Sequence, residues 1–248
     1  MRRIGAAALL VLWPTGLLAQ DWARDPAARD FVESNVLATF YHELGHALVD
    51  TLQLPVLGRE EDAADTLSAL LIHDLWQEEP AANMVYHTAG AFLAYAAEAE
   101  AGGHDLPYWD EHALDMQRYY NLICLFYGAN PDEREEMAIE LELPQDRAQR
   151  CPDEFALAAD SWGVMLEGLA PGPEAKGLVM VDTKARSVLR SLVATEVAEL
   201  NKTYGLPEEI SVSVEPCGQA NAFYHPDARR ITICTEYADD LGRLWRSF

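Results

Sequence analysis

The feature that most constrains this chain is a pair of histidines four residues apart, His42 and His46, inside a long apolar stretch. Apolar residues recur at helical spacing from about residue 30 to residue 54, and Pro55 follows, so the stretch is expected to be a helix. Residues four apart share one face of a helix, so both imidazoles can point at one position, with Glu43 beside them. Each of these polar groups would cost roughly 1 to 3 kcal/mol if it were buried without a partner. A metal ion or a dense hydrogen-bond network is therefore expected on this face.

A second acidic segment supplies carboxylates at the same four-residue spacing, Glu61 and Asp65. Both fall on a second expected helix, at about residues 60–76. Acids on a first helical turn are favourable without any metal, and this alone could explain Glu60 to Asp62. It does not explain Asp65, which lies one turn further on among apolar residues. We expect Glu61 to be the third metal ligand and Asp65 to orient a ligating histidine.

Two imidazoles and one carboxylate form a ligand set typical of catalytic zinc, which keeps a fourth position for water. In the HExxH pattern the glutamate acts as the general base of a metallopeptidase. The sequence therefore predicts one Zn²⁺ ion held by His42, His46 and Glu61, with Glu43 as the catalytic base. A structural zinc ion in a non-catalytic binding or assembly protein is the main alternative, but a structural site has no use for Glu43. The sequence hardly distinguishes a peptidase from a zinc hydrolase that acts on another amide or on an ester.

Residues 1–19 have the pattern of a secretory signal peptide. Arg2 and Arg3 precede an apolar run, and the small residue Ala19 suits the cleavage site. A retained membrane anchor is the alternative, but the run is shorter than the roughly 20 apolar residues that a span needs, and a proline and a glycine break it. We expect a bacterial periplasmic or secreted protein with no stable membrane insertion after cleavage.

The chain is strongly acidic, with a formal net charge of -23 at pH 7. Such a surface repels phosphate backbones, so nucleic acid is not expected as a partner. The charge could steer cationic peptides toward a cleft, or it could simply be a solvated surface that favours solubility. Hydrophobic residues make up 50% of the chain, which is enough for a sizeable core, and residues 20–248 are expected to form a single domain. The oligomeric state is not indicated.

The chain has four cysteines, an even number for a protein that is expected to fold in an oxidising compartment. Two disulfides are predicted. Proximity in sequence favours Cys124 with Cys151 and Cys217 with Cys234, and the other two connectivities stay open. No CxxC pair is present, so a cysteine-type zinc site is not supported.

The remaining pattern predicts an α+β protein that is mainly helical. Further helices are expected at about residues 83–101, 110–127, 152–169 and 183–204. Alternating apolar residues then predict a strand at about 210–214 and a hairpin formed by 221–224 and 231–234, with a turn at 226–229. The tail after Asp239 carries too little pattern to assign.

Three segments resemble a bacterial family catalogued as "putative metallopeptidases" of unknown function. They are YHELGHAL at 41–48, LPVLGREEDAAD at 54–65 and CGQANAFYHP at 217–226. The resemblance covers nearly the whole mature chain, and the first two segments are the more specific. It implies a peptidase but names no substrate beyond a peptide or protein.

HExxH followed by ExxxD is also similar, more distantly, to the gluzincin peptidases. There the Glu of ExxxD binds zinc and the Asp supports the first histidine. The resemblance thus implies a zincin-like fold with an HExxH helix, an ExxxD helix and a C-terminal β-hairpin. It assigns zinc binding to Glu61 and the support of His42 to Asp65.

In the neprilysin branch of those enzymes an Asn-Ala-Phe/Tyr strand binds the main chain of the substrate. By this resemblance Asn221 and Ala222, followed by Phe223, would bind substrate here. Two departures set this chain apart, because its strand follows the zinc helix instead of preceding it and its gap between His46 and Glu61 is short. An ordinary hairpin with Asn221 beside the turn is the alternative.

The group that would stabilise the oxyanion in catalysis is not indicated by any spacing. Six side chains qualify by type alone, and each is as compatible with a surface or packing role: Tyr86, His87, His104, His112, Tyr224 and His225.

Overall fold

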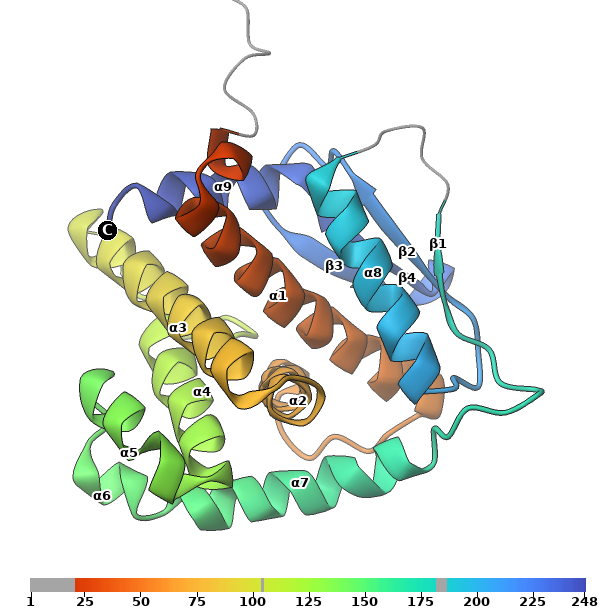
Figure 1. Cartoon of the computed structure of the whole chain (residues 1–248), viewed down its shortest axis with the longest axis horizontal. Helices are drawn as coiled ribbons and strands as arrows, with labels where there is room; N and C mark the ends of the chain where they lie inside the picture. Colours follow the sequence, from red (N-terminus) through yellow and green to blue (C-terminus); the bar gives the residue numbers. More distant parts are fainter. Residues whose placement is uncertain (1–20, 104, 182–186) are drawn as a thin grey trace, which may run out of the picture.

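The computed structural model describes residues 21–103, 105–181 and 187–248, so the expected signal peptide lies outside the described residues. Helices make up most of the described chain, and a small sheet lies to one side of the central helix α1 (Figure 1). The elements are η1 (Asp21–Arg24), α1 (Pro26–Leu52), α2 (Glu60–Leu75), α3 (Glu78–Ala101), α4 (Asp115–Ala129), α5 (Pro131–Glu140), α6 (Gln145–Ala148), α7 (Cys151–Glu167), β1 (Leu178–Met180), α8 (Val188–Thr203), β2 (Ile210–Glu215), β3 (Ala222–His225), η2 (Pro226–Ala228), β4 (Arg230–Cys234) and α9 (Thr235–Trp245).

Helix α1 is the centre of the molecule. Asp25 caps its start by accepting the main-chain N–H of Ala27 at 3.0 Å, and Pro26 occupies the first turn, where no N–H is required. The helix ends at Gln53, whose φ of 52° is left-handed. Helices α2, α3, α8 and α9 and strands β3 and β4 all contact it. Because it is enclosed in this way, most of its side chains are buried.

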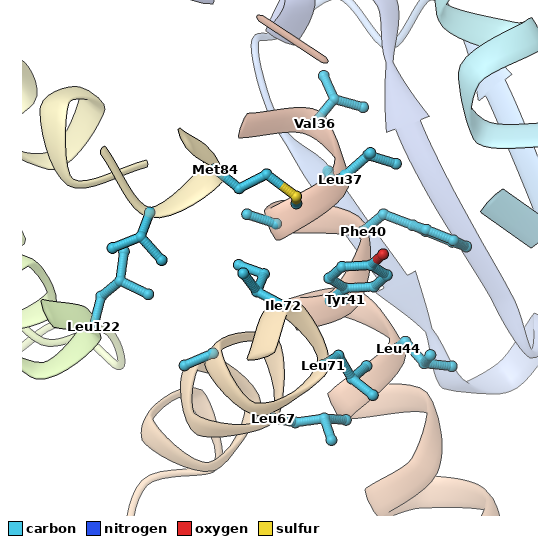
Figure 2. Packing of buried hydrophobic residues seen from close by; sticks show 14 of the residues in the cluster. Val36, Leu37, Phe40, Tyr41, Leu44, Leu67, Leu71, Ile72, Met84 and Leu122 are labelled. Atoms are coloured by element: carbon cyan, nitrogen blue, oxygen red, sulfur yellow. The ribbon is translucent and has the colours of Figure 1, made fainter. Parts of the chain in front are cut away.

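The core is continuous between α1 and the helices beside it. Figure 2 shows apolar side chains of α1 packed against those of α2, α3 and α4. One polar group crosses this core, because the hydroxyl of Tyr41 donates to Glu196 at 2.7 Å and accepts from the Trp76 indole at 2.9 Å. The residue before His42 is therefore fixed by both packing and hydrogen bonds.

Helices α1 and α2 approach each other most closely at Gly45 and Ala64. A Cβ on Gly45 would lie 2.8 Å from the Cα of Ala64, which is too close for any side chain. The glycine inside the HELGH segment is thus explained by packing. Glu61 and Asp65 flank Ala64 on α2, so the close approach brings both carboxylates to the histidines of α1.

The sheet has the order β1-β2-β4-β3. Strands β1, β2 and β4 are parallel, whereas β3 pairs antiparallel with β4 and forms one edge. Helices α8 and α1 both contact the sheet and each other. Strand β3, whose other edge is unpaired, contacts α1, the helix that carries the HExxH segment.

Both disulfides favoured by sequence proximity are present. Cys124 of α4 is joined to Cys151 at the start of α7, and Cys217 is joined to Cys234 at the end of β4. The two other connectivities are thereby excluded. In the described part of the chain, no helix is both long enough and apolar enough to cross a membrane.

The prediction of a mainly helical α+β protein with a C-terminal hairpin is confirmed. The predicted helix at 110–127 begins too early, because residues 110–114 form an irregular segment before Asp115. The start of the helix predicted at 183–204 lies partly outside the described residues, and α8 begins at Val188. The unassigned tail is helix α9, and β1 and α5 had no counterpart in the prediction.

Candidate metal centre

Helix α1 presents its two histidines on one side. Their Nε2 atoms lie 3.2 Å apart, and the two rings are nearly perpendicular at 80°. The side chain of His42 is 7% exposed and that of His46 is 15% exposed. The helical spacing thus brings two imidazole nitrogens to one point near the surface of the core.

The first turn of α2 brings Glu61 to the same point. Its Oε2 lies 3.1 Å from His42 Nε2 and 3.3 Å from His46 Nε2. None of its short contacts has hydrogen-bond geometry, so Oε2 is a buried carboxylate oxygen without a donor. A buried oxygen in this state is costly unless it contacts a cation.

A third imidazole, that of His112, also reaches this oxygen. It belongs to the segment between α3 and α4, and its Nε2 lies 2.9 Å from Glu61 Oε2. His42, Glu61 and His112 each offer one atom within 4.8 Å of the others and so form a candidate metal site. The sequence offers His112 only as one of six side chains that could stabilise the oxyanion. Its nearness to His42, with parallel rings 6.1 Å apart, depends on the tertiary structure.

All three histidines are held from behind by a carboxylate on Nδ1. His42 Nδ1 lies 2.8 Å from Asp65 and His46 Nδ1 lies 2.8 Å from Glu60. His112 Nδ1 is 3.1 Å from Asp110. A carboxylate on Nδ1 is the usual support of a metal-binding histidine, because it fixes the tautomer that leaves Nε2 free.

The donor atoms have the spacing that a metal ion requires. In a tetrahedral site with bonds of 2.0 to 2.1 Å to nitrogen, neighbouring ligand atoms are about 3.3 Å apart. The contacts among His42, His46 and Glu61 measure 3.1 to 3.3 Å. The orphaned Glu61 oxygen and the Nε2 atoms of His42 and His46 therefore fit a bound cation.

The charges at the site point the same way. Burial lowers the pKa of His42, but the nearby carboxylates of Asp65 and Glu61 outweigh it and raise this pKa to about 9. Burial raises the pKa of Glu61, yet the surrounding imidazoles hold it far below its ordinary value. The site thus favours positive charge at its centre, whether as protons or as a metal ion.

Asp65 is itself fixed by a second partner. Arg118 donates from Nε to Asp65 Oδ2 at 2.8 Å and from Nη2 to Oδ1 at 2.7 Å, a two-pronged ion pair. The guanidinium also lies 4.5 Å above the ring of Phe92. Burial favours the neutral form of Asp65, but Arg118 and His42 keep its pKa low. The carboxylate behind His42 is thus both charged and rigid.

Glu43 projects from α1 beside the cluster. It is 7% exposed, and burial raises its pKa above the ordinary value. His42 and His46 oppose that rise, as does a hydrogen bond from the main chain of Tyr224. A carboxyl with a raised pKa next to a metal site is suited to exchange protons near neutral pH.

A family model described as "Putative metallopeptidase" matches residues 17–166 and 181–247. The chain belongs to this family. No curated protein and no solved structure matches the chain. Membership of this family agrees with a cluster of side chains that could hold a metal ion.

The predicted substrate-binding residues lie at the start of β3 on the free edge of the sheet. Asn221 lines the cavity at the metal centre, and its side-chain oxygen accepts the N–H of Ala222 at 2.9 Å. The main-chain oxygen of Asn221 accepts from Cys234 at 3.1 Å, so this residue faces β4. Main-chain groups alternate in an antiparallel pair, so those of Ala222 and Tyr224 face the free edge.

A cavity of about 630 Å³ opens beside the metal centre. Its wall includes His42, Glu43 and His112, together with Thr39 and Tyr237. It extends between α1, α3, α4, α7 and α9, where both polar and apolar side chains line it. The candidate metal site therefore borders a space large enough for several side chains.

Proposed function

We propose that this chain is a zinc-dependent peptidase in which His42, His46 and Glu61 hold the metal and Glu43 is the general base. One observation carries the proposal: two imidazole nitrogens and an orphaned carboxylate oxygen converge on one point beside a buried glutamate. Membership of the metallopeptidase family supports the class of reaction.

A zinc ion in this position would polarise the scissile carbonyl and lower the pKa of a water molecule toward about 7. Glu43 would take the proton of that water as it attacks the carbonyl carbon and would then pass it to the leaving amine. The raised pKa of Glu43 suits both transfers, because a carboxyl whose pKa lies closer to the working pH takes the proton of water more readily and keeps it until the amine leaves.

We assign Asp65 a positioning role. It holds Nδ1 of His42 and is in turn held by Arg118, so the Nε2 atom keeps its direction toward the metal. Glu60 has the same relation to His46, although its side chain is 48% exposed and makes a looser support.

The free edge of β3 is the proposed binding surface for the main chain of the substrate. An extended peptide can add to such an edge as a further strand, with hydrogen bonds to the outward groups of Ala222 and Tyr224. Tyr224 already contacts Glu43 through its main chain, so a peptide on this edge would pass the general base. The side chain of Asn221 caps the Ala222 N–H, which protects the edge when no peptide is bound.

We infer that the enzyme works in the periplasm or outside the cell. Two disulfides support this inference, because such bonds persist in oxidising compartments and are rare in the cytosol. The sequence pattern of residues 1–19 adds to it.

One observation favours a second candidate, a non-catalytic protein with a closed zinc site. The imidazole of His112 could be a fourth protein ligand, and four protein ligands are the mark of structural zinc. The buried Glu43 argues for the peptidase, because a closed site has no proton for it to move.

The test is cleavage of a peptide library by the zinc-loaded mature protein, read by mass spectrometry, with Glu43→Gln as the matched control. The proposal expects cleavage by the wild type, a loss of about 10²-fold or more in Glu43→Gln, and one zinc ion in each. Equal cleavage by both proteins, or a wild type without stoichiometric metal, would overturn it.

A further inference from the structure

The ring of His112 is attached on both sides in the same manner as the two histidines of α1. Its Nε2 faces Glu61 Oε2 at 2.9 Å and its Nδ1 faces Asp110 at 3.1 Å. The same oxygen of Asp110 accepts the main-chain N–H of His112 at 2.9 Å, which fixes the turn that carries the ring. Such an arrangement aims a free nitrogen at a metal. We propose that His112 is a fourth, displaceable ligand that closes the metal site in the resting protein.

This inference rests on the proposed peptidase function. A site with two imidazoles, one carboxylate and a third imidazole has all four tetrahedral positions filled by protein. Water then has no place at the metal, and Glu43 has no proton to take. Hydrolysis therefore requires one protein ligand to leave, and the site as it stands is latent.

The structure distinguishes His112 as the ligand that leaves. Its side chain is 47% exposed, whereas those of His42 and His46 are 7% and 15% exposed. The two helical histidines lie on α1, which is enclosed by other elements over most of its length. His112 lies outside any helix or strand, between the end of α3 and the start of α4. Its withdrawal would disturb no regular hydrogen bond of the fold.

The segment before His112 is only weakly attached to the rest of the protein. Residues 105–112 are all exposed, and Tyr108 and Trp109 keep 78% and 80% of their surface in solvent. Two aromatic rings that stay this exposed add almost nothing to the attachment of this segment. The bonds of Asp110 to His112 lie within the segment, and the contact of His112 with Glu61 joins it to α2. Few contacts and high exposure are typical of regions that open locally.

The first test counts the imidazoles at the metal. X-ray absorption of the zinc-loaded wild type should give three imidazoles in outer-shell scattering, and His112→Ala should give two. Zinc affinity, measured by competition with a chelator, should fall at least about tenfold in His112→Ala. Glu111→Gln is the matched control, since it changes an exposed acid of the same segment and should keep three imidazoles. Circular dichroism of each metal-free variant checks that the fold is intact.

The second test measures peptide cleavage. If the closed form makes up about 90% of the resting enzyme, His112→Ala, which cannot form it, should have a kcat/KM about tenfold above that of the wild type at saturating zinc. A drop in kcat/KM with two imidazoles still bound would overturn the inference and make His112 a group that acts on the substrate. Only two imidazoles bound to zinc in the wild type would also overturn the inference about His112, and the peptidase proposal would survive. Absence of bound zinc, or cleavage by Glu43→Gln, would instead defeat the proposed function itself.

Discussion

Gly45 of α1 faces Ala64 of α2 at a distance that leaves no room for a side chain. A Cβ at position 45 would be 2.8 Å from the Cα of Ala64 and 3.1 Å from its Cβ. The two helices that carry the candidate ligands therefore touch through their backbones. This contact sets the distance between Glu61 and the two histidines of α1, because Glu61 lies one turn before Ala64.

The first prediction follows from this contact. Gly45→Ala should lower the free energy of unfolding by roughly 1 to 3 kcal/mol, because the added methyl group forces the helices apart. It should also weaken zinc binding, since Glu61 moves away from His42. Chemical denaturation and a zinc titration measure the two effects.

The matched control for this change is Gly163→Ala, in which the glycine lies within helix α7 and an added Cβ meets nothing within 4 Å. The free energy of unfolding of that variant should rise by about 0.5 to 1 kcal/mol, because alanine favours the helix more than glycine does. Equal stability of Gly45→Ala and the wild type would show that the helices tolerate the extra atom and that the contact does not set the site.

The sequence predicts the parts of the site that repeat at helical spacing. His42, His46, Glu61 and Asp65 can be found because each pair is four residues apart on an apolar helix, and geometry within one helix is local. The shared metal site predicts that the two helices meet, but the backbone contact at Gly45 and Ala64 was not predicted, although these are the small residues that permit it.

His112 could not be singled out, because its place at the site depends on how the α3–α4 segment folds back over α2. Its one local signal is Asp110 two residues earlier, and a pairing at that spacing is common in exposed turns. Strand β1 has only three residues and gains its partners from β2, far along the chain. Helix α9 had a weak signal in Ala238, Leu241 and Leu244, which share its buried face.

The second prediction concerns the carboxylate behind His42. Arg118→Met should cost about 3 kcal/mol of stability, because it leaves the charged Asp65 without its partner. Zinc affinity should also fall, by about 10- to 100-fold, since the support of a ligating histidine is loosened. Methionine keeps the packing against Phe92, so the loss can be assigned to the ion pair.

Arg29→Met is the control for Arg118→Met. Arg29 pairs with Glu33 at 2.6 Å on the surface, with side chains that are 49% and 24% exposed. Exposed pairs of this kind contribute less than about 1 kcal/mol. If the two variants lose the same stability, or if Arg118→Met binds zinc as tightly as the wild type, Asp65 does not act through Arg118.

The third prediction is a pH dependence that arises away from the metal centre. His73 of α2 accepts a hydrogen bond from Arg134 at 3.0 Å, which requires a neutral ring. Burial and the nearby guanidinium of Arg134 lower the pKa of His73. A histidine with a lowered pKa stabilises the fold above its unfolded pKa of about 6.5, and this contribution is lost as the pH falls through that value, because the unfolded chain binds the proton more readily.

His73→Gln isolates this contribution, because glutamine does not titrate. Wild type and variant should be compared by urea denaturation at about pH 7.5 and about pH 5.5. The stability advantage of the wild type should shrink at the lower pH. An advantage that stays constant or grows on acidification would contradict the assignment.

The fourth prediction separates metal binding from catalysis. Glu43→Gln should keep one zinc ion and lose cleavage by about 10²- to 10⁴-fold, because the amide cannot accept the proton of water. His42→Ala and Glu61→Ala should lose both zinc and activity, since each removes a ligand. Metal analysis of the three purified variants, together with peptide cleavage, decides between the roles. If Glu61→Ala kept full zinc occupancy while Asp65→Ala or Glu60→Ala lost it, the ligand assignment would be wrong, although the class of enzyme would stand.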